Sequence, residues 1–543
     1  MTITAPLPST FPPTLPAALA MAATRLPNAP ALIEPGRLWS FAELQRQVRT
    51  AASAFLAHGI RKGDVIAVWA PNQGEWIVAA LGAQTVGAVL TPLNTRLKGK
   101  EAADILRRSR ARLLFTVGDF LGTDYRALLA DALLADALLA DPLLADPLLA
   151  DGALPDLDRT VLFDEPDGWT AFLAAGKGPD DPSVDAALAA VGPDDPSDIL
   201  FTSGTTGSPK GVVSCHGQTV RLFKVWGQIV DLREGDRFLI INPFFHTFGY
   251  KAGWLACLLA GATILPLAVF NTNDVARLIR DEGVSFLPGP PTIFQSLLAE
   301  QQGLAQGRIA LRVAVTGAAT VPPILVERMQ KELGFETVVT GYGMTECGVI
   351  AMCRVGDSID RIATTCGKAL PGLELRCIDD QGLTLPSGQA GEILVRGFGV
   401  MQGYLDDPAA SAEAIDDDGW LHTGDIGVLD EHGYLRITDR KKDMYITGGF
   451  NCYPAEIEKQ LCEHPKVEMA AVVGFPDERM GEVGKAFLVL RPGQTADAEE
   501  IIAWSKANMA NYKVPRAIEF LDALPKNAAG KVMRMDLKSN RQP

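Results

Sequence analysis

The sequence predicts an α/β protein with a large N-terminal domain of layered α/β subdomains plus a β subdomain, and a small α/β C-terminal domain. Helical and strand patterns alternate over residues 38–117 and again over 198–339, as in layered folds with largely parallel strands. Short alternating strands separated by glycine-rich turns follow over 392–439. We therefore expect an N-terminal domain over 1–439 and a C-terminal domain over 440–543.

Local periodicity predicts the individual elements. A 3.6-residue apolar repeat predicts helices over 41–58, 75–86 and 100–109, and short apolar runs predict strands over 65–69 and 113–116. Further along the chain, strands are expected over 198–201, 238–242, 312–316, 392–396, 434–438, 470–474 and 486–490, with a helix over 453–462.

Residues 127–151 form a low-complexity insert of five tandem copies of Ala/Pro-Leu-Leu-Ala-Asp. A five-residue period advances about 140° per copy around a helix, so the leucines wind around it without forming one apolar face. Pro142 and Pro147 interrupt any helix. An amphipathic partner- or membrane-binding segment stays open, but we favour a repeat expansion in a loop that tolerates insertions.

Composition excludes several classes of protein. The 543 residues allow more than one core, and the net charge of −15 argues against a nucleic-acid partner. The apolar stretch 254–270 contains Gly261 and Pro266 and is short for a membrane span. The eight cysteines are scattered without a CxxC pair, and the N-terminus lacks the basic region of a signal peptide. We expect a cytoplasmic protein with reduced thiols and no integral membrane association.

The most informative segment is Asp-Ile-Leu-Phe-Thr-Ser-Gly-Thr-Thr-Gly-Ser-Pro-Lys-Gly, residues 198–211. An apolar strand ends at Phe201 and leads into a loop whose backbone N–H groups and hydroxyls can surround an anion. It is not a Walker A loop, because Pro209 precedes the lysine and Gly211 follows it. The candidate polyphosphate-binding residues are Thr202, Ser203, Gly204, Thr205, Thr206, Gly207 and Lys210.

Four further blocks follow this loop. They are Gly-Tyr-Gly-Met-Thr-Glu (341–346), Gly-Trp-Leu-His-Thr-Gly-Asp (419–425), Asp-Arg-Lys-Lys-Asp (439–443) and Pro-Lys-Asn-Ala-Ala-Gly-Lys (525–531). In this order and spacing the chain resembles the adenylate-forming superfamily of acyl- and aryl-CoA ligases, luciferases and peptide-synthetase adenylation domains. The resemblance implies an ATP-dependent acid:CoA ligase that forms acyl-AMP and then acyl-CoA, with ATP, CoA and a small carboxylic acid as substrates and Mg²⁺ as cofactor.

The resemblance also implies roles for residues of the nucleotide site. Glu346 would bind Mg²⁺, since a hydrated Mg²⁺ needs one or two carboxylates, and Thr345 would contact the α-phosphate. Asp425 would accept hydrogen bonds from the ribose diol, and Arg440 would add a hydroxyl or phosphate contact. The adenine would lie between Tyr342 and Gly317-Ala318, beside the backbone of Gly341, Gly343 and Met344.

The small C-terminal domain is mobile in the family, and its residues are expected to act in turn. Lys531 would bridge the substrate carboxylate and the α-phosphate during adenylation. Lys442 lies at the expected hinge, and Gly448 and Gly449 would leave room for the pantetheine of CoA in the second half-reaction. Catalytic roles are thus expected for Thr205, His246, Glu346 and Lys531.

The block over residues 242–253, Asn-Pro-Phe-Phe-His-Thr-Phe-Gly-Tyr-Lys-Ala-Gly, resembles the segment that lines the acyl pocket. His246 would lie beside the substrate carboxylate. Lys251 would contact a polar group of the substrate or extend to solvent, because a buried lysine among aromatic rings requires an acceptor. The other expected pocket residues are Phe245, Phe248, Gly249 and Trp254.

The acid itself is the least determined part of the prediction. The acyl block is similar to that of actinobacterial ligases for ring-bearing propionates from steroid degradation, and a medium- or long-chain fatty acid stays open. A ligase that delivers acyl-AMP to a carrier protein and a non-catalytic nucleotide-binding protein are the alternatives. The sequence also leaves a homodimer open.

Overall fold

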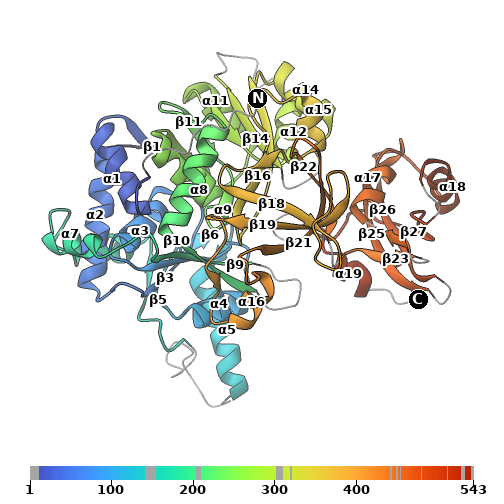
Figure 1. Ribbon diagram of the computed structural model, residues 1–543. Coiled ribbons are helices and arrows are strands. Elements are labelled where there is room, and N and C mark those ends of the chain that lie inside the picture. Colours follow the sequence, from blue (N-terminus) through green and yellow to red (C-terminus); the bar gives the residue numbers. More distant parts are fainter. Residues whose placement is uncertain are drawn as a thin grey trace. The chain divides into compact units, whose positions relative to one another are not determined.

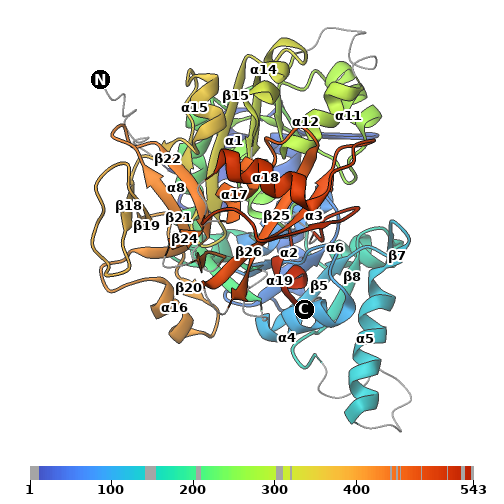
Figure 2. The same cartoon turned by 90° about the vertical axis from the view of Figure 1, so that its right-hand side faces the viewer.

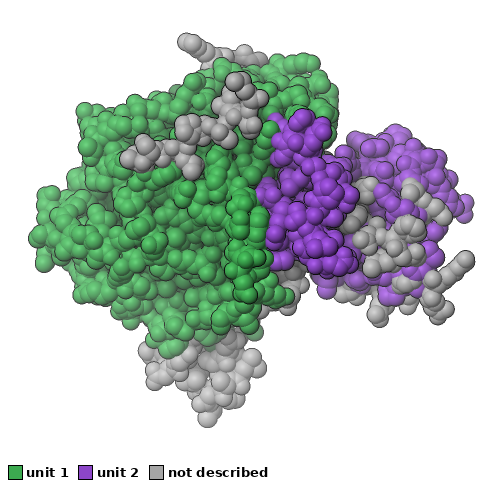
Figure 3. Space-filling model, in the orientation of Figure 1, with its two compact units in different colours: residues 1–374, 396–421 green, residues 375–395, 422–543 purple. Residues whose placement is uncertain are grey.

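The structure is a computed structural model in which the chain divides into two compact units (Figure 3). The first comprises residues 1–374 and 396–421, and the second comprises 375–395 and 422–543. The domain boundary expected at 439–440 stays a prediction. The structure describes residues 11–140, 154–202, 209–300, 310–317, 321–440, 443–447, 450–452, 454–477, 480–509, 512–526 and 532–539.

Sheet A is the nine-stranded sheet among the described residues of the first unit. Its central strands pair in parallel, as predicted for a layered α/β fold; they are β15, β14, β13, β11, β12 and β1. Antiparallel strands flank them, with β2 on one side and β16 and β17 on the other. In spatial order the strands are β17 (Lys368–Ala369), β16 (Gly348–Met352), β15 (Thr337–Met344), β14 (Val313–Gly317), β13 (Phe286–Pro288), β11 (Arg237–Ile240), β12 (Thr263–Pro266), β1 (Pro30–Glu34) and β2 (Arg37–Ser40).

Sheet B is the seven-stranded sheet of the same unit, again counted over the described residues. Its parallel centre continues into an antiparallel hairpin, β9–β10, whose outer strand pairs with β20. A two-stranded hairpin, β6 (Asp119–Phe120) and β7 (Thr123–Asp124), stands apart from it. In spatial order the strands of sheet B are β20 (Gly403–Tyr404), β10 (Lys210–Cys215), β9 (Pro196–Thr202), β4 (Val89–Pro92), β3 (Val65–Trp69), β5 (Ala111–Thr116) and β8 (Arg159–Leu162).

Helices cover both sheets, and α1, α2 and α3 pack against one another (Figure 1). The helices predicted over 41–58, 75–86 and 100–109 are confirmed as α2, α3 and α4. The helices of this unit are α1 (Leu15–Arg25), α2 (Phe41–Ala57), α3 (Gly74–Thr85), α4 (Gly99–Ser109), α5 (Tyr125–Ala140), η2 (Pro166–Thr170), α6 (Ala171–Ala174), α7 (Pro182–Ala189), α8 (His216–Ile229), α9 (Thr247–Gly249), η3 (Tyr250–Leu255), α10 (Ala256–Ala260), α11 (Thr272–Asp281), α12 (Pro291–Ala299), α14 (Pro323–Lys331), α15 (Ile359–Thr364) and α16 (Pro408–Ala414).

Among its described residues, the second unit contains most of a four-stranded sheet, in which β21 and β22 pair antiparallel, and a five-stranded sheet packed with helices. Arg534 of α19 binds Glu458 of α17 at 2.7 Å and Asp443 at 3.4 Å, which ties the last helix to the rest of this unit. The elements are β18 (Leu373–Ile378), β19 (Ala390–Gly397), β21 (Leu421–Leu429), β22 (Leu435–Arg440), β23 (Tyr445–Thr447), β24 (Phe450–Cys452), α17 (Pro454–Leu461), β25 (Val467–Asp477), β26 (Gly481–Leu490), α18 (Ala498–Asn508), β27 (Ala517–Phe520) and α19 (Arg534–Ser539).

The repeat insert differs from the prediction in its first part. Its first copies form helix α5, which packs against α4 and extends away from the sheets in both views (Figures 1 and 2). Tyr125, Leu129, Ala132 and Leu133 are buried, at the i, i+4, i+7, i+8 spacing of one helical face. The preferred interpretation as an inserted loop is therefore wrong for this part of the repeat. Residues 141–153 lie outside the described part of the chain.

No helix in the described part of the chain is long and apolar enough to cross a membrane. The apolar stretch over 254–270 instead supplies part of η3, helix α10 and strand β12, whose side chains are mostly buried. All eight cysteines are free.

A buried histidine links helix α1 to helix α8. His216 is fully buried, and the backbone N–H of Leu15 donates to its Nδ1 at 3.4 Å. Burial lowers the pKa of His216 from 6.5 to about 4, against the opposing charge of Asp195. The native state therefore holds a neutral ring at pH 7, whereas the unfolded chain binds a proton at pH values below 6.5.

We predict that His216 makes the protein less stable in mild acid. The contribution of the neutral His216 to the free energy of unfolding is complete above pH 6.5 and is lost as the pH falls toward 4. At pH 5 the loss amounts to about 2 kcal/mol. In chemical denaturation at pH 7.5 and pH 5.0, His216→Asn should lose less stability than the wild type over this interval. His432→Asn, at an exposed position, is the control. Equal pH dependence of the wild type and His216→Asn would contradict the prediction.

Candidate functional site

The candidate site of the first unit lies where the carboxyl ends of the two large sheets meet. Asn72 follows β3 of sheet B and is 7% exposed. Its Nδ2 donates to the backbone oxygens of Ile240, Asn242 and Leu267, which follow or end strands of sheet A, at 3.0–3.3 Å. Its Oδ1 accepts from the N–H of Phe244 at 2.8 Å. One amide thus fixes the start of the predicted acyl segment against sheet B.

The predicted phosphate loop connects the two strands of the β9–β10 hairpin. Thr202 and Lys210 are paired across this hairpin, and Thr202 Oγ1 donates to the Lys210 carbonyl at 3.3 Å. Arg108 of α4 donates to the carbonyl of Pro209 at 2.6 Å, and its guanidinium lies over the ring of Phe201. Both ends of the loop are therefore held. Ser203, Gly204, Thr205, Thr206 and Gly207 lie outside the described residues.

The Gly-Tyr-Gly-Met-Thr-Glu block forms the end of β15 and the turn into β16. Gly341 pairs with Gly317 of β14, so the two segments predicted to flank adenine are neighbours in sheet A. A Cβ on Gly343 would come within 2.0 Å of the Gly348 carbonyl, so this position requires glycine. Tyr342, Met344 and Thr345 are partly buried along the same turn. Ala318 lies outside the described residues.

Glu346 and Lys210 are brought together by a tyrosine that sequence analysis did not identify. The Tyr404 hydroxyl donates to Glu346 Oε1 at 3.0 Å, and Lys210 Nζ lies 4.8 Å from the centre of the Tyr404 ring. Burial and the Glu346 charge raise the pKa of Tyr404, so the phenol stays protonated and acts as the donor. The Glu346 carbonyl also accepts from Met401 N at 2.8 Å. The cluster places a carboxylate at the hydroxyl of one ring and an ammonium over the same ring.

The acyl-side segment begins after β11 and contains His246 at the start of the short helix α9. Part of the His246 side chain reaches solvent, and the protein packed around the rest of it lowers its pKa by desolvation, which favours a neutral ring. Its Nδ1 accepts from Phe248 N at 3.2 Å, so the proton of the neutral ring resides on Nε2. Phe245 and Phe248 are half-buried. A Cβ on Gly249 would approach the Pro243 carbonyl to 2.1 Å, so glycine is required there.

Two residues expected in the acyl pocket are buried and contact other residues of the protein. Trp254 is fully buried and stacks on Tyr250 with ring centres 4.9 Å apart. Lys251 is 4% exposed, and its Nζ lies 2.7 Å from Asp198 Oδ1 and donates to Ser214 Oγ at 3.0 Å. The prediction that Lys251 meets a substrate oxygen or solvent is therefore wrong, because an acidic residue of the protein pairs with it.

In the second unit, Asp425 is 6% exposed on β21, and its N–H donates to Thr423 Oγ1 at 3.1 Å. It pairs with Arg440 of β22, so the two residues predicted to contact ribose and its neighbours are adjacent across one strand pair. Lys442, Gly448, Gly449 and Lys531 lie outside the described residues, and their roles stay predictions.

Sequence analysis missed Asn72, Arg108 and Tyr404. Each is separated by more than fifty residues from the partner it holds. Their residue types are also common at protein surfaces. Tyr404 had one local signal, a Gly-Tyr pair directly before an acidic turn, and this did not identify its partners.

Comparison with known proteins identifies the family of the chain. A model described as AMP-binding enzyme matches residues 19–405, and one described as AMP-binding enzyme C-terminal domain matches 456–531. The chain is 47% identical over 531 residues to a 3-[(3aS,4S,7aS)-7a-methyl-1,5-dioxo-octahydro-1H-inden-4-yl]propanoyl:CoA ligase of Rhodococcus jostii, covering 98% of this chain and 99% of the relative. A Mycobacterium tuberculosis ligase of the same name is 48% identical, with 97% and 98% covered.

Solved structures agree with the fold. An o-succinylbenzoate CoA synthetase from Bacillus subtilis, in complex with its acyl-adenylate intermediate, has 28% identity and a TM-score of 0.78, covering 98% of this chain and 99% of that one. A Mycobacterium tuberculosis fatty acyl CoA synthetase has 30% identity and a TM-score of 0.74, with 96% and 97% covered. The chain belongs to the AMP-binding enzyme family and is an AMP-forming acid–thiol ligase, an acyl-CoA synthetase.

Proposed function

We propose that this ligase activates a bulky, ring-bearing propionate of the kind released by steroid degradation. The observation that carries the proposal is the near-full-length identity of 47–48% to two ligases named for a methyl-dioxo-octahydroindenyl propanoyl group. A medium- or long-chain fatty acid is the second candidate, supported by the fatty acyl CoA synthetase among the similar structures. We place the reaction in the cytoplasm, since eight free cysteines suit a reducing compartment. A homodimer stays open.

The chemistry proceeds in two transfers. A carboxylate oxygen attacks the α-phosphorus of ATP, pyrophosphate leaves, and acyl-AMP forms. The CoA sulfur, as thiolate, then attacks the acyl carbonyl carbon, and AMP leaves with the electron pair of the broken C–O bond. The protein must align the acid with the α-phosphate and stabilise the charge that develops on the phosphates.

The proposed roles come from the sequence blocks, and contacts among the described residues support some of them. Glu346 is the Mg²⁺ ligand, held in orientation by Tyr404, and Lys210 contacts the terminal phosphates together with the hydroxyls and N–H groups of the phosphate loop. Bound Mg²⁺ would supply positive charge that neutralises the departing pyrophosphate. His246 presents its Nε2–H as a neutral donor beside the acid. Thr205, Thr345, Asp425, Arg440 and Lys531 complete the proposed ATP contacts, with Lys442, Gly448 and Gly449 serving the CoA step.

A panel of acids tests the substrate assignment. With saturating ATP and Mg²⁺, we expect kcat/KM for a bicyclic dioxo-propionate to exceed that for octanoate, palmitate, an aryl acid or acetate by roughly a hundredfold, equivalent to about 2.7 kcal/mol of differential transition-state binding. Pyrophosphate release and thioester formation are followed with and without CoA. A fatty acid that matches the bicyclic acid would remove the assignment. Acyl-AMP that accumulates in the presence of CoA would favour delivery to a carrier protein.

Tyr404 provides a test of the metal site. Tyr404→Phe keeps the ring next to Lys210 but loses the hydroxyl that binds Glu346. We expect the Mg²⁺ concentration for half-maximal adenylation to rise roughly tenfold, since a hydrogen bond to a charged group contributes about 1.5–3 kcal/mol. Tyr404→Leu should also raise the KM for ATP.

The control for Tyr404→Phe is Tyr125→Phe, which removes a phenol that donates to the Thr95 carbonyl at 2.9 Å. It should leave the Mg²⁺ requirement unchanged. If Tyr404→Phe and the wild type show the same Mg²⁺ dependence, Glu346 is not positioned by this hydroxyl.

Lys531→Ala separates the two half-reactions. Because the proposed ammonium acts only while acid and α-phosphate come together, adenylation should fall by about two orders of magnitude or more, as for loss of one stabilising group at a developing charge. Thioester formation from supplied acyl-AMP should remain within a few-fold of wild type. Equal loss of both half-reactions in a folded variant would show that Lys531 is not specific to adenylation.

A further inference from the structure

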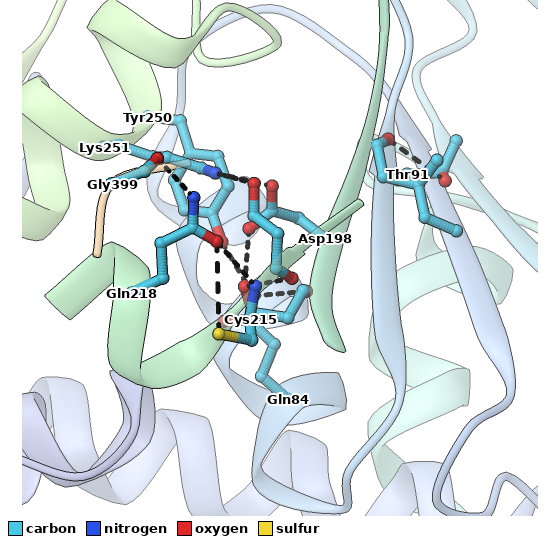
Figure 4. A network of polar contacts seen from close by, with 11 residues as sticks. Gln84, Thr91, Asp198, Cys215, Gln218, Tyr250, Lys251 and Gly399 are labelled. Carbon is cyan, nitrogen blue, oxygen red and sulfur yellow. Dashed lines mark hydrogen bonds and ion pairs between the residues drawn. The ribbon is translucent and has the colours of Figure 1, made fainter. Parts of the chain in front are cut away.

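A buried ion pair joins the two large sheets of the first unit. Asp198 of β9 is fully buried, and Lys251 of η3 is 4% exposed. Lys251 Nζ lies 2.7 Å from Asp198 Oδ1 and donates to Ser214 Oγ of β10 at 3.0 Å (Figure 4). Lys251 lies in the segment that follows strand β11 of sheet A. It therefore contacts both strands of the sheet B hairpin, β9 and β10, that carries the phosphate loop.

One further hydrogen bond reaches the same carboxylate, and two more connect the residues around it. Ser197 Oγ donates to Asp198 Oδ2 at 2.7 Å. Gln84 Nε2, on α3, donates to the Ser197 carbonyl at 3.0 Å and to the Tyr250 hydroxyl at 2.7 Å. Figure 4 shows Gln84, Asp198, Tyr250 and Lys251 gathered in this network. The network has one charge of each sign and holds four elements at fixed distances.

Stability alone does not account for this pair. Removing two charges from water opposes folding, and apolar side chains of similar volume in place of a buried pair are often neutral or stabilising. The position of the pair is more informative. Asp198 and Ser214 lie at the root of the hairpin, and Lys251 lies five residues after His246 in the acyl-side segment. The contact spans the elements that would carry the two reacting substrates.

We infer that Lys251 is a positioning residue for adenylation: its ion pair with Asp198 holds the phosphate-loop hairpin and the acyl-side segment in register, so that the acid carboxylate and the α-phosphorus of ATP are aligned. This inference rests on the proposed sites for ATP and the acid. Lys251 itself contacts neither substrate. Its effect should appear in the step that joins two separate molecules, since alignment within about 3–3.5 Å governs that step.

The test uses a variant that removes both charges. Lys251→Met alone would leave Asp198 unpaired in the core and would destabilise the protein. In the double variant Asp198→Asn/Lys251→Met we expect melting close to that of the wild type, while kcat for adenylation falls by roughly 10- to 100-fold. Thioester formation from supplied acyl-AMP, in which acid and phosphate are already covalently joined, should stay within about threefold.

A second buried pair of the same unit is the matched control. Arg312 binds Asp236 and also Asp231, and Arg312 and Asp236 directly precede β14 and β11, at the amino ends of the sheet A strands. Asp236→Asn/Arg312→Met removes a comparable pair away from the strand ends that carry the site. We expect it to alter melting but to leave the ratio of the two half-reaction rates at the wild-type value.

A milder variant covers the case in which the double variant does not fold. Ser214→Ala removes one acceptor of Lys251 and keeps the ion pair, so adenylation should fall by about two- to fivefold, within the range of a single neutral hydrogen bond, with thioester formation unchanged. The inference is overturned if the folded double variant, or the folded Ser214→Ala variant, loses both half-reactions to the same extent. It is also overturned if neither half-reaction slows in such a variant. Any acid that the wild type adenylates serves, so a wrong substrate assignment would show in the wild type, whereas a wrong role for Lys251 would show only in this ratio.

Discussion

The register between the two large sheets of the first unit depends on a few buried polar contacts that cross from one sheet to the other. Asn72 connects the end of β3 to the ends of β11 and β12, and the Lys251–Asp198 pair connects η3 to β9. Tyr404, on the edge strand of sheet B, reaches Glu346 at the end of sheet A. The candidate ATP and acyl residues of this unit lie on segments that these contacts hold.

These contacts are strict because each buried polar atom requires a partner. An unpaired buried donor or acceptor costs about 1–3 kcal/mol, so a shift of one sheet against the other would break several bonds at once. The four hydrogen bonds of Asn72 engage both the nitrogen and the oxygen of its side-chain amide. Tyr404 likewise makes two contacts with one side chain: its hydroxyl orients Glu346, and its ring faces the Lys210 ammonium. Groups that would act on ATP are thus placed before ATP binds.

The sequence predicted the fold class and nine strands and four helices that the structure contains, because short apolar runs and 3.6-residue repeats are local signals. Strands β3 and β9 and helices α2 to α4 match their predicted ranges within three residues. The prediction for the repeat insert failed because it considered the five-residue period over all five copies together. Leu129, Ala132 and Leu133 of the first two copies still form one buried face with Tyr125, which precedes the repeat, and this is enough for α5 to pack.

Candidate site residues could be proposed from the sequence where they lie within one short block. Their hydrogen-bond and ion-pair partners could not be predicted where these lie far away in the sequence. Lys251 was recognised as a lysine among aromatic side chains that needs an acceptor, but the acceptor lies 53 residues earlier, in a strand that was considered only for its loop. Glu346 was proposed as a site residue from its block, while its hydrogen-bond partner Tyr404 lies 58 residues away. Pairings of this kind depend on topology, and one sequence contains no local signal for them.

The need for directional contacts at the sheet junction follows from the chemistry. Hydrophobic contact is non-directional and roughly proportional to buried area, so an apolar junction alone would permit small sliding movements between the sheets. Hydrogen bonds weaken steeply as their distance and angle depart from the optimum. Joining an acid to ATP depends on displacements of about 1 Å, because two reacting atoms from separate molecules must approach within about 3–3.5 Å. In a ligase whose substrates bind to segments from two sheets, polar contacts between those sheets would limit such displacements, and the buried amide and ion pair and the half-buried phenol of this chain lie at that junction.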